Sequence, residues 1–392
     1  MNHLSPKRLL NGQYIMLTAV NFLVSISYSM VSTTLASYIS HMGFAVAVAG
    51  TITGAFSIAS MVVRPFTGVF SDRLDRRALL IIATIVMGLC TFMYSVAHSF
   101  ALLLIIRLVH GMAFAFSSTV NMAAIPYLVP EKRIGEGISY FGVAQSVGIA
   151  IGPSLGIYIL SSSSYTVNFV VSASIAIGAA LIAFTILPMP SNGRAGRSVR
   201  ISDIIAKECV IYMIVDIAIA SANGLENSLI ALYGMQQGIA NIGWYFTISA
   251  VVLCITRVVL GRVADAKGVA YALYPGLVLM IAGLLLLWRA DSVFLFAAAS
   301  TIKTLGVGLA RPAIQAACLT SVPPERRGSA SSTYYIGSDI GQGTSPAVGG
   351  WIVDRTGRQD YGAAFAWYTL PLLLGGALFA CYEYKWKGLK KA

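Results

Sequence analysis

Residues 64–72 read RPFTGVFSD, and residues 257–265 read RVVLGRVAD. Both segments follow the pattern R-x3-G-x3-D, and they lie 193 residues apart. A second pair has the same offset, since residues 148–156 read GIAIGPSLG and residues 341–349 read GQGTSPAVG. Similarity at one long, fixed offset is the signature of a duplicated structural unit. The sequence therefore predicts a chain built from two similar halves.

Long apolar stretches dominate the rest of the chain. Hydrophobic residues make up 57% and charged residues 11% of the 392 positions, whereas soluble domains carry about 25% charged residues. A helix needs roughly 20 apolar residues to cross the hydrocarbon core of a bilayer. Twelve stretches of suitable length can be placed, at residues 14–36, 45–68, 78–97, 100–124, 137–160, 165–187, 208–232, 241–261, 269–288, 293–318, 329–353 and 361–384. We expect an all-α integral membrane protein with twelve transmembrane helices in two pseudo-symmetric six-helix bundles.

One sizeable polar break interrupts the apolar stretches. Residues 188–200 read PMPSNGRAGRSVR, a composition rich in Pro, Gly, Ser and Arg that is typical of a linker. We therefore expect an N-terminal bundle at residues 1–187, a basic cytoplasmic linker at residues 188–207 and a C-terminal bundle at residues 208–392.

The net charge of +12 comes from basic residues in alternate loops, which argues against a nucleic-acid surface. With the N-terminus placed in the cytoplasm, most of the 27 Lys and Arg residues fall on the cytoplasmic side of the predicted helices. Such an excess marks the cytoplasmic loops of membrane proteins. We expect both termini to lie in the cytoplasm.

Five cysteines lie far apart in or beside apolar stretches, and the sequence has no CxxC or HExxH motif. This placement is typical of packing residues rather than of disulfides or metal ligands. Short external loops without paired cysteines, and the lack of a targeting segment, indicate a bacterial plasma membrane. We expect no metal site and no cofactor.

Residues 68–77 read GVFSDRLDRR, a charged loop led by glycine between two apolar stretches. This loop resembles the one between helices 2 and 3 of major facilitator superfamily transporters, whose usual form is G-x-L-x-D-R-x-G-R-[KR]. The sequence departs from that form at Asp75, where the family usually has glycine. Through the repeat, the resemblance covers the whole chain, and it implies a secondary transporter with the major facilitator fold.

The resemblance also implies a conformational latch on the cytoplasmic side. Asp72 would face the start of the predicted helix at residues 329–353, where the helix dipole favours a negative charge. The arginines of the loop would pair with acidic neighbours. The latch residues are Gly68, Asp72, Arg73, Arg76 and Arg77, with Gly261 and Asp265 in the second half. Alternatively, the arginines only fix the topology.

A glycine-rich motif lies in the fifth predicted helix. Gly148, Gly152, Pro153 and Gly156 resemble the helix 5 motif that, in this superfamily, is characteristic of exporters that exchange substrate against protons. Three glycines on one helical face allow close packing against another helix, and the proline bends the span. The motif favours export. The alternative is ordinary packing through small residues.

Residues 103–111 read LLIIRLVHG, which resembles the R-x-x-Q-G motif of the family's fourth helix, with His110 in place of Gln. A guanidinium within a membrane span must face partners or water, so Arg107 indicates a functional site or, alternatively, a structural ion pair. Polar and aromatic residues on the same and neighbouring helices would line a central substrate cavity. We assign to it Asn21, Tyr28, Arg107, His110, Phe114, Lys303, Arg311, Tyr335 and Gln342.

Proton coupling requires an ionisable group that can lose and regain a proton within the membrane. The candidates are Asp216, Glu226 and Asp339. If Asp216 or Asp339 faces Lys303 or Arg107, it could switch between a salt-bridged and a protonated state. The alternative is a permanent ion pair that holds helices together. The first helix contains no acid, unlike that of some drug and proton antiporters of the superfamily.

The leading hypothesis is a proton-coupled exporter of a small amphiphilic molecule. The cations within the membrane suggest an anionic or zwitterionic substrate, and we expect the chain to act as a monomer. A facilitator or importer of a small nutrient is the alternative. A channel or a membrane enzyme is less favoured, because the four histidines are isolated and no phosphate-binding loop is present.

Overall fold

The computed structural model describes residues 8–44, 46–188, 205–239, 242–260, 268–356 and 360–389. Within these ranges the chain is helical and has no β-strand, which confirms the predicted all-α fold class. Most of the predicted linker, together with Gly261 and Asp265, lies outside the described residues.

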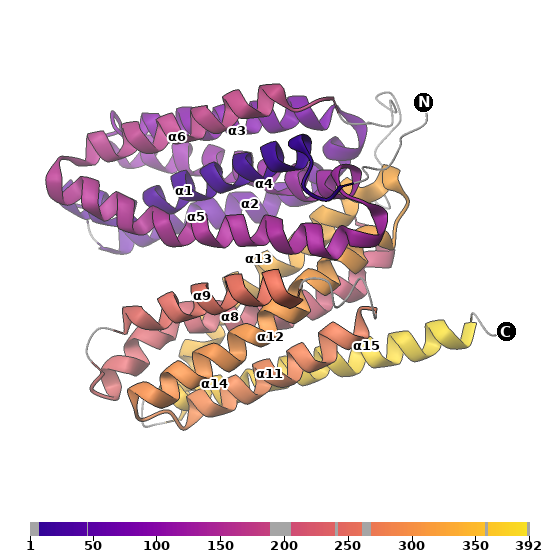
Figure 1. The fold of residues 1–392 in the computed structure, drawn as a ribbon. Coiled ribbons are helices and arrows are strands. Elements are labelled where there is room, and N and C mark those ends of the chain that lie inside the picture. Colours follow the sequence, from indigo (N-terminus) through magenta and orange to yellow (C-terminus); the bar gives the residue numbers. More distant parts are fainter. Residues whose placement is uncertain are drawn as a thin grey trace. The chain divides into compact units, whose positions relative to one another are not determined.

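Each apolar stretch predicted in the first half coincides with a long helix (Figure 1). The helices are α1 (Gly12–His41), α2 (Val46–Arg73), α3 (Arg76–Met93), α4 (Phe100–Leu128), α5 (Ile134–Ser162) and α6 (Tyr165–Thr185). A short 3-10 helix, η1 (Glu131–Arg133), precedes α5.

The second half follows the same plan. Its helices are α8 (Val210–Gln236), α9 (Gly243–Leu260), α11 (Ala270–Trp288), α12 (Val293–Thr320), α13 (Arg327–Arg355), α14 (Tyr361–Trp367) and α15 (Thr369–Leu389). The short helices η2 (Lys207–Cys209) and η3 (Pro324–Arg326) precede α8 and α13. The twelfth predicted span is thus divided between α14 and α15.

Among the described residues, ten helical segments are long and apolar enough to cross a membrane, and part of α9 forms a shorter apolar helix. The helix α13 is not one of the ten, although it has 29 residues. Its sequence is rich in Gly, Ser and Thr, which lowers its hydropathy. The internal repeat therefore predicts this helix more clearly than its hydropathy does.

The contacts within the chain divide it into two compact units. The first unit consists of Met1–Ala206 and Val322–Ser332, and the second of Lys207–Ser321 and Thr333–Ala392. The division falls inside α13, whose first residues group with the first unit.

In the first unit, α1 packs against α5 and α6, α2 packs against α4, and α3 packs against α4 and α6 (Figure 1). The contact of α5 with α1 depends on its glycines. A Cβ atom on Gly148 would lie 2.8 Å from the Phe22 carbonyl oxygen, and one on Gly152 would lie 2.8 Å from the Ile26 carbonyl oxygen. Only glycine allows the two backbones to approach this closely.

The loop between α2 and α3 shows why Asp75 can replace the glycine usual in the family. Asp75 is the N-cap residue of α3, and its carboxylate accepts a hydrogen bond of 3.0 Å from the backbone N–H of Arg77. The backbone of Asp75 is extended, with φ −62° and ψ 115°, so no positive φ is required there. Aspartate is a favoured N-cap residue because it satisfies an otherwise free helical donor.

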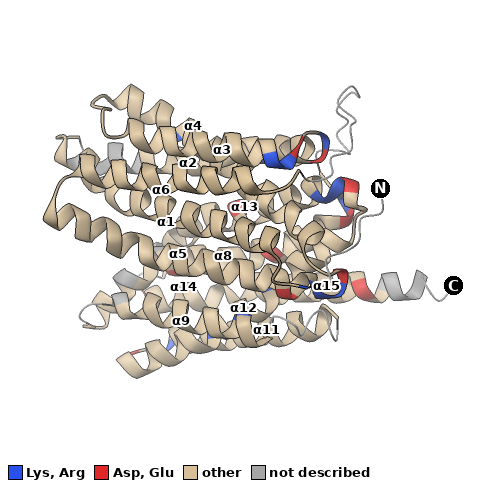
Figure 2. Cartoon of the chain, turned by 45° about the horizontal axis from the view of Figure 1, so that its top comes forward, with Lys and Arg blue, Asp and Glu red and all other residues tan. Residues whose placement is uncertain are grey.

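Charged residues of the first unit gather at one end of its helices, as Figure 2 shows. Asp72 and Arg73 end α2, Arg76 and Arg77 begin α3, and η1 carries Glu131, Lys132 and Arg133. We refer to this end as the charged end of the first unit.

Candidate functional site

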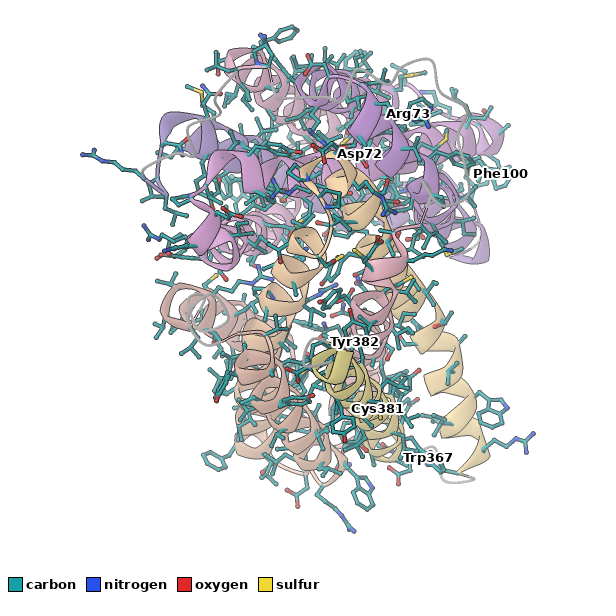
Figure 3. The ribbon with its side chains drawn as sticks, turned by 90° about the vertical axis from the view of Figure 1, so that its right-hand side faces the viewer. Asp72, Arg73, Phe100, Trp367, Cys381 and Tyr382 are labelled. Carbon is teal, nitrogen blue, oxygen red and sulfur yellow. The ribbon has the colours of Figure 1, made fainter. Side chains whose placement is uncertain are left out.

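The first group of candidate residues lies at the charged end of the first unit and centres on Asp72 (Figure 3). This side chain is 9% exposed. It accepts hydrogen bonds from the backbone N–H groups of Gly328, at 2.6 Å, and Ser329, at 2.9 Å, and from the Ser329 hydroxyl, at 2.9 Å. These donors belong to the first turn of α13, where the helix dipole is positive. Nη2 of Arg76 lies 3.2 Å from Oδ1 of Asp72 and also donates a hydrogen bond to this carboxylate.

Close backbone approach makes these contacts possible. A Cβ atom on Gly68 would lie 2.9 Å from the carbonyl oxygen of Gly328, and one on Gly328 would lie 2.5 Å from the carbonyl oxygen of Gly68. Beyond this crossing, the hydroxyl of Ser332 donates to the Arg64 carbonyl oxygen, and the hydroxyl of Ser331 donates to that of Thr119 at 3.1 Å. The start of α13 is thus bonded to both α2 and α4.

Two arginines of this region share one aromatic ring. The guanidinium carbons of Arg76 and Arg327 lie 4.8 Å and 4.9 Å from the centroid of Tyr127, whose hydroxyl donates to the carbonyl oxygen of Pro324. Arg77 instead donates to the carbonyl oxygen of Phe184, and Arg73 is half-buried. Tyr127 was not among the residues predicted from the sequence, because a tyrosine at the end of an apolar helix carries no distinctive pattern.

A second group lies within the first unit around Arg107, which is 2% exposed. Its guanidinium carbon lies 4.8 Å from the centroid of Phe56, and the Tyr94 hydroxyl interacts with the guanidinium. That hydroxyl also lies 3.3 Å from Nδ1 of His110, a side chain that is fully buried. The predicted residues Arg107 and His110 therefore share two aromatic neighbours that no sequence motif indicates.

Three aromatic rings lie beside this pair. Tyr28 and Phe114 stack with centroids 5.0 Å apart, and Phe56 lies 5.1 Å from Tyr28 and 5.3 Å from Phe114. Tyr28 and Phe114 are half-buried, whereas Phe56 is buried. Asn21 lies elsewhere on α1, where its amide donates to the Phe141 carbonyl oxygen at 3.4 Å.

A third group lies in the second unit and centres on Asp216, which is fully buried. Its Oδ1 atom accepts hydrogen bonds from Arg311, at 3.1 Å, and from the Tyr334 hydroxyl, at 2.7 Å. Its Oδ2 atom is buried and has no hydrogen-bond partner among the described residues. The Arg311 side chain is 22% exposed and also donates to Ser338, to which Gln342 donates at 3.3 Å.

The remaining predicted cation of the second unit, Lys303, forms a buried ion pair with Glu226. Both side chains are about 5% exposed. Asp339 and Tyr335 are half-buried on α13, and the Tyr335 ring lies 5.6 Å from that of Tyr334. The sequence suggests Asp216 or Asp339 as the partner of Lys303 or Arg107, whereas the structure pairs Asp216 with Arg311.

The two ion pairs fit a single register between α8 and α12. Asp216 and Glu226 are ten residues apart on α8, and their partners Arg311 and Lys303 are eight residues apart on α12, in the opposite order. Neighbouring spans that run in opposite directions produce this reversed order. The pairing could have been found in the sequence by aligning the two helices antiparallel.

The chain is similar in sequence to known membrane transporters. The model of the Major Facilitator Superfamily matches residues 17–238 and 209–385. Multidrug resistance protein 1 of Bacillus subtilis is 24% identical over 345 residues, which cover 85% of this chain and 87% of that protein. An uncharacterised MFS-type transporter of Methanocaldococcus jannaschii is 23% identical over 319 residues, covering 79% and 82% of the two chains.

Solved structures share the fold. The crystal structure of the human organic anion transporter MFSD10 (TETRAN) matches with a TM-score of 0.81 and 16% identity, over 93% of this chain and 98% of that one. The transporter FucP in its outward conformation matches with a TM-score of 0.78 and 14% identity, over 95% and 98%. The predicted major facilitator fold is therefore confirmed.

Proposed function

Since the chain belongs to the major facilitator superfamily and is a multi-pass membrane transporter rather than an enzyme, we propose that it exports a small amphiphilic molecule in exchange for protons. One observation supports the coupling of transport to protons. The buried carboxylate of Asp216 faces a cation, and one of its oxygens has no hydrogen-bond partner in the described part of the chain.

The unbonded Oδ2 atom of Asp216 is where a proton would bind. Burying an ionised carboxylate oxygen that accepts no hydrogen bond is costly, and binding a proton there would remove the buried charge. Protonation would also remove the charge that holds Arg311. Because the Arg311 side chain is 22% exposed, the released guanidinium can turn towards water or substrate. The same residue would thus switch between a salt-bridged and a protonated state.

The ion pair of Glu226 and Lys303 is the second candidate for coupling. Its two side chains are each about 5% exposed, whereas Arg311 is 22% exposed, so protonation of Glu226 would not release a cation that can turn towards water. We therefore assign the coupling proton to Asp216, and we keep Glu226 and Asp339 as contributors to be tested beside it.

Two further features support export by alternating access. The glycine face of α5 packs tightly on α1, as the resemblance to exchanging exporters implies. Asp72 closes the charged end of the first unit on the start of α13 and would act as the conformational latch. A transport cycle that opens this end must break these hydrogen bonds. We propose that this end faces the cytoplasm of a bacterial cell, that both termini lie there and that the protein acts as a monomer.

Transport into everted membrane vesicles tests the proposal. Anionic, zwitterionic and cationic fluorescent amphiphiles are offered with and without an imposed proton gradient. At least one should accumulate only with the gradient. Asp216→Asn should abolish this uphill transport but keep the exchange of labelled for unlabelled substrate, because exchange needs no net proton movement.

Asp291→Asn is the matched control, because Asp291 is exposed outside the helices. It should transport as the wild type does. Uphill transport at the wild-type rate by Asp216→Asn, Glu226→Gln and Asp339→Asn alike would reject coupling through these acids.

A facilitator or importer of a small nutrient is the second candidate function. It is favoured by the observation that Asp216 and Glu226 each already have a cationic partner, as in permanent ion pairs. Such a protein would equilibrate its substrate across the vesicle membrane at the same rate with or without the gradient.

A further inference from the structure

Arg107 has no counter-ion among the described residues of the first unit. The acidic residues of this unit occur only at positions 72, 75, 131, 136, 203 and 325. All but residue 203, which lies outside the described ranges, belong to the charged end or to η3 and the start of α5. Arg107 lies 21 residues before the end of α4, roughly 30 Å along the helix from the charged end. Lys303 and Arg311 of the second unit differ from Arg107, since each contacts a carboxylate.

Several buried nitrogen atoms at this place have no hydrogen-bond partner within the described ranges. They are Nε and Nη1 of Arg107 and Nε2 of His110. Buried polar atoms without partners are rare in native proteins, and each calls for an explanation such as a functional role, a bound ion or an ordered water. Arg107 and His110 are three residues apart on one face of α4, and both contact Phe56 and Tyr94. Their unbonded nitrogens therefore belong to one site.

We propose that this site binds the carboxylate of an aromatic substrate, with the guanidinium of Arg107 as its counter-ion. The inference rests on the proposed transport function and names the substrate class. Guanidinium groups form strong, directional hydrogen bonds to carboxylates. A cationic substrate would be repelled by Arg107, and a neutral one would leave its charge uncompensated.

The aromatic part of the substrate is indicated by the rings next to Arg107. Tyr28 and Phe114 are half-buried, and Phe56 contacts both of these rings as well as the guanidinium of Arg107. A planar substrate ring can stack on Tyr28 and Phe114 while its carboxylate reaches the buried nitrogens. Stacked rings at such spacing gain energy beyond the area that they bury.

Binding to the purified full-length protein tests the proposal without a proton gradient. The probes are 2-naphthoate, its neutral isostere 2-naphthamide, the cation 2-naphthylmethylamine and the non-aromatic anion octanoate, each measured by calorimetry. The wild type should bind naphthoate at least about tenfold more tightly than the amide or the amine, since a buried charge pair contributes more than a neutral contact. Equal affinity for naphthoate and naphthamide would overturn the proposal on the wild-type protein alone.

Variants locate the site. Arg107→Gln should raise the dissociation constant for naphthoate by about thirtyfold or more, and Arg107→Lys by less. Phe114→Leu should weaken the binding of naphthoate by about two- to tenfold, because it removes the aromatic stacking. The affinity for octanoate, which has no ring to stack, should stay unchanged. Arg289→Gln is the matched control, since Arg289 also stacks on an aromatic ring, at 4.4 Å from Trp288, but is exposed. Its affinity should equal that of the wild type.

Unchanged naphthoate affinity in folded Arg107→Gln, verified by a monodisperse gel-filtration peak, would also overturn the proposal. The outcome is separable from that of the transport assay. Naphthoate binding through Arg107 without gradient-driven transport would reject proton coupling and retain the anion site. Gradient-driven transport of other solutes without naphthoate binding would reject the anion site and retain proton coupling.

Discussion

At the residue scale, Asp72 and Asp75 are two carboxylates in one loop with different partners. Asp72 bonds to the start of α13, whereas Asp75 caps α3. The motif distinguishes them, because Asp72 matches the family pattern and Asp75 departs from it. What the motif alone cannot give is the N-cap geometry, which depends on where α3 begins.

Replacing Asp72 tests the proposed latch. Asp72→Asn keeps one acceptor oxygen but loses the charge, so the contact with Gly328 and Ser329 should weaken by about 2 kcal/mol or more. Hydrogen exchange of the peptide spanning residues 322–332 should become faster. Asp75→Asn is the control, since asparagine is an equally good N-cap residue, and it should leave this exchange unchanged. Equal exchange in wild type and Asp72→Asn would contradict the latch.

The pair of Glu226 and Lys303 allows a second prediction at this scale. Removal of one partner leaves a buried charge, so Lys303→Met or Glu226→Gln alone should destabilise the protein by about 3–5 kcal/mol. The double variant removes both charges and should recover most of this loss. Thermal unfolding of the purified variants measures both the loss of stability and its recovery. If the double variant is no more stable than the singles, the two residues are not a pair.

At the element scale, the glycine face of α5 was predictable from its spacing, but its packing partner was not. A spacing of four residues shows that Gly148, Gly152 and Gly156 share a face. It does not show that this face meets α1, because any neighbouring helix could fill it. The polar residues of α1 give no hint, since serines such as Ser25 and Ser29 fit a hydrated surface as well as a packed one.

Substitution of Gly152 tests this packing. A Cβ atom there would lie 2.6 Å from Cβ of Ser29 and 2.8 Å from a backbone oxygen of α1, so Gly152→Ala should destabilise the protein by about 1–3 kcal/mol. On α6, a Cβ atom added at Gly178 would meet none of the described atoms within 4 Å, so Gly178→Ala should be neutral or slightly stabilising. Thermal unfolding in detergent compares the two. Similar effects of both substitutions would count against the close approach.

At the scale of the whole molecule, duplication and hydropathy predicted the fold class, and the comparisons confirmed the superfamily. The repeat supports the predicted span at residues 329–353, although the polar composition of α13 keeps it out of the helices that are apolar enough to cross a membrane. The candidate sites were less predictable. Charged residues within the membrane could be identified from the sequence, yet their pairing depends on how α8 and α12 align. The aromatic neighbours Phe56 and Tyr94 of Arg107 come from other helices and carry no local signal.

The predicted topology is testable on the intact cell. In a cysteine-free background, Ser163→Cys between α5 and α6 should react with an impermeant maleimide added outside. Lys132→Cys in η1 should react only after the membrane is permeabilised. Each single-cysteine variant controls for the other. The opposite pattern would invert the proposed orientation and place the latch outside the cell.

The reversed order of the two ion pairs restricts how the second unit can deform. Sliding α8 along α12 by one helical turn, about 5.4 Å, would separate both pairs at once and leave four charges unpaired in hydrocarbon. Sliding by a longer step would not re-form two pairs, because it moves both carboxylates in the same direction along α12 and at most one of them can reach the other cation. While both pairs are formed they hold the two helices in one register, so we expect α8 and α12 to move together as one block until Asp216 is protonated.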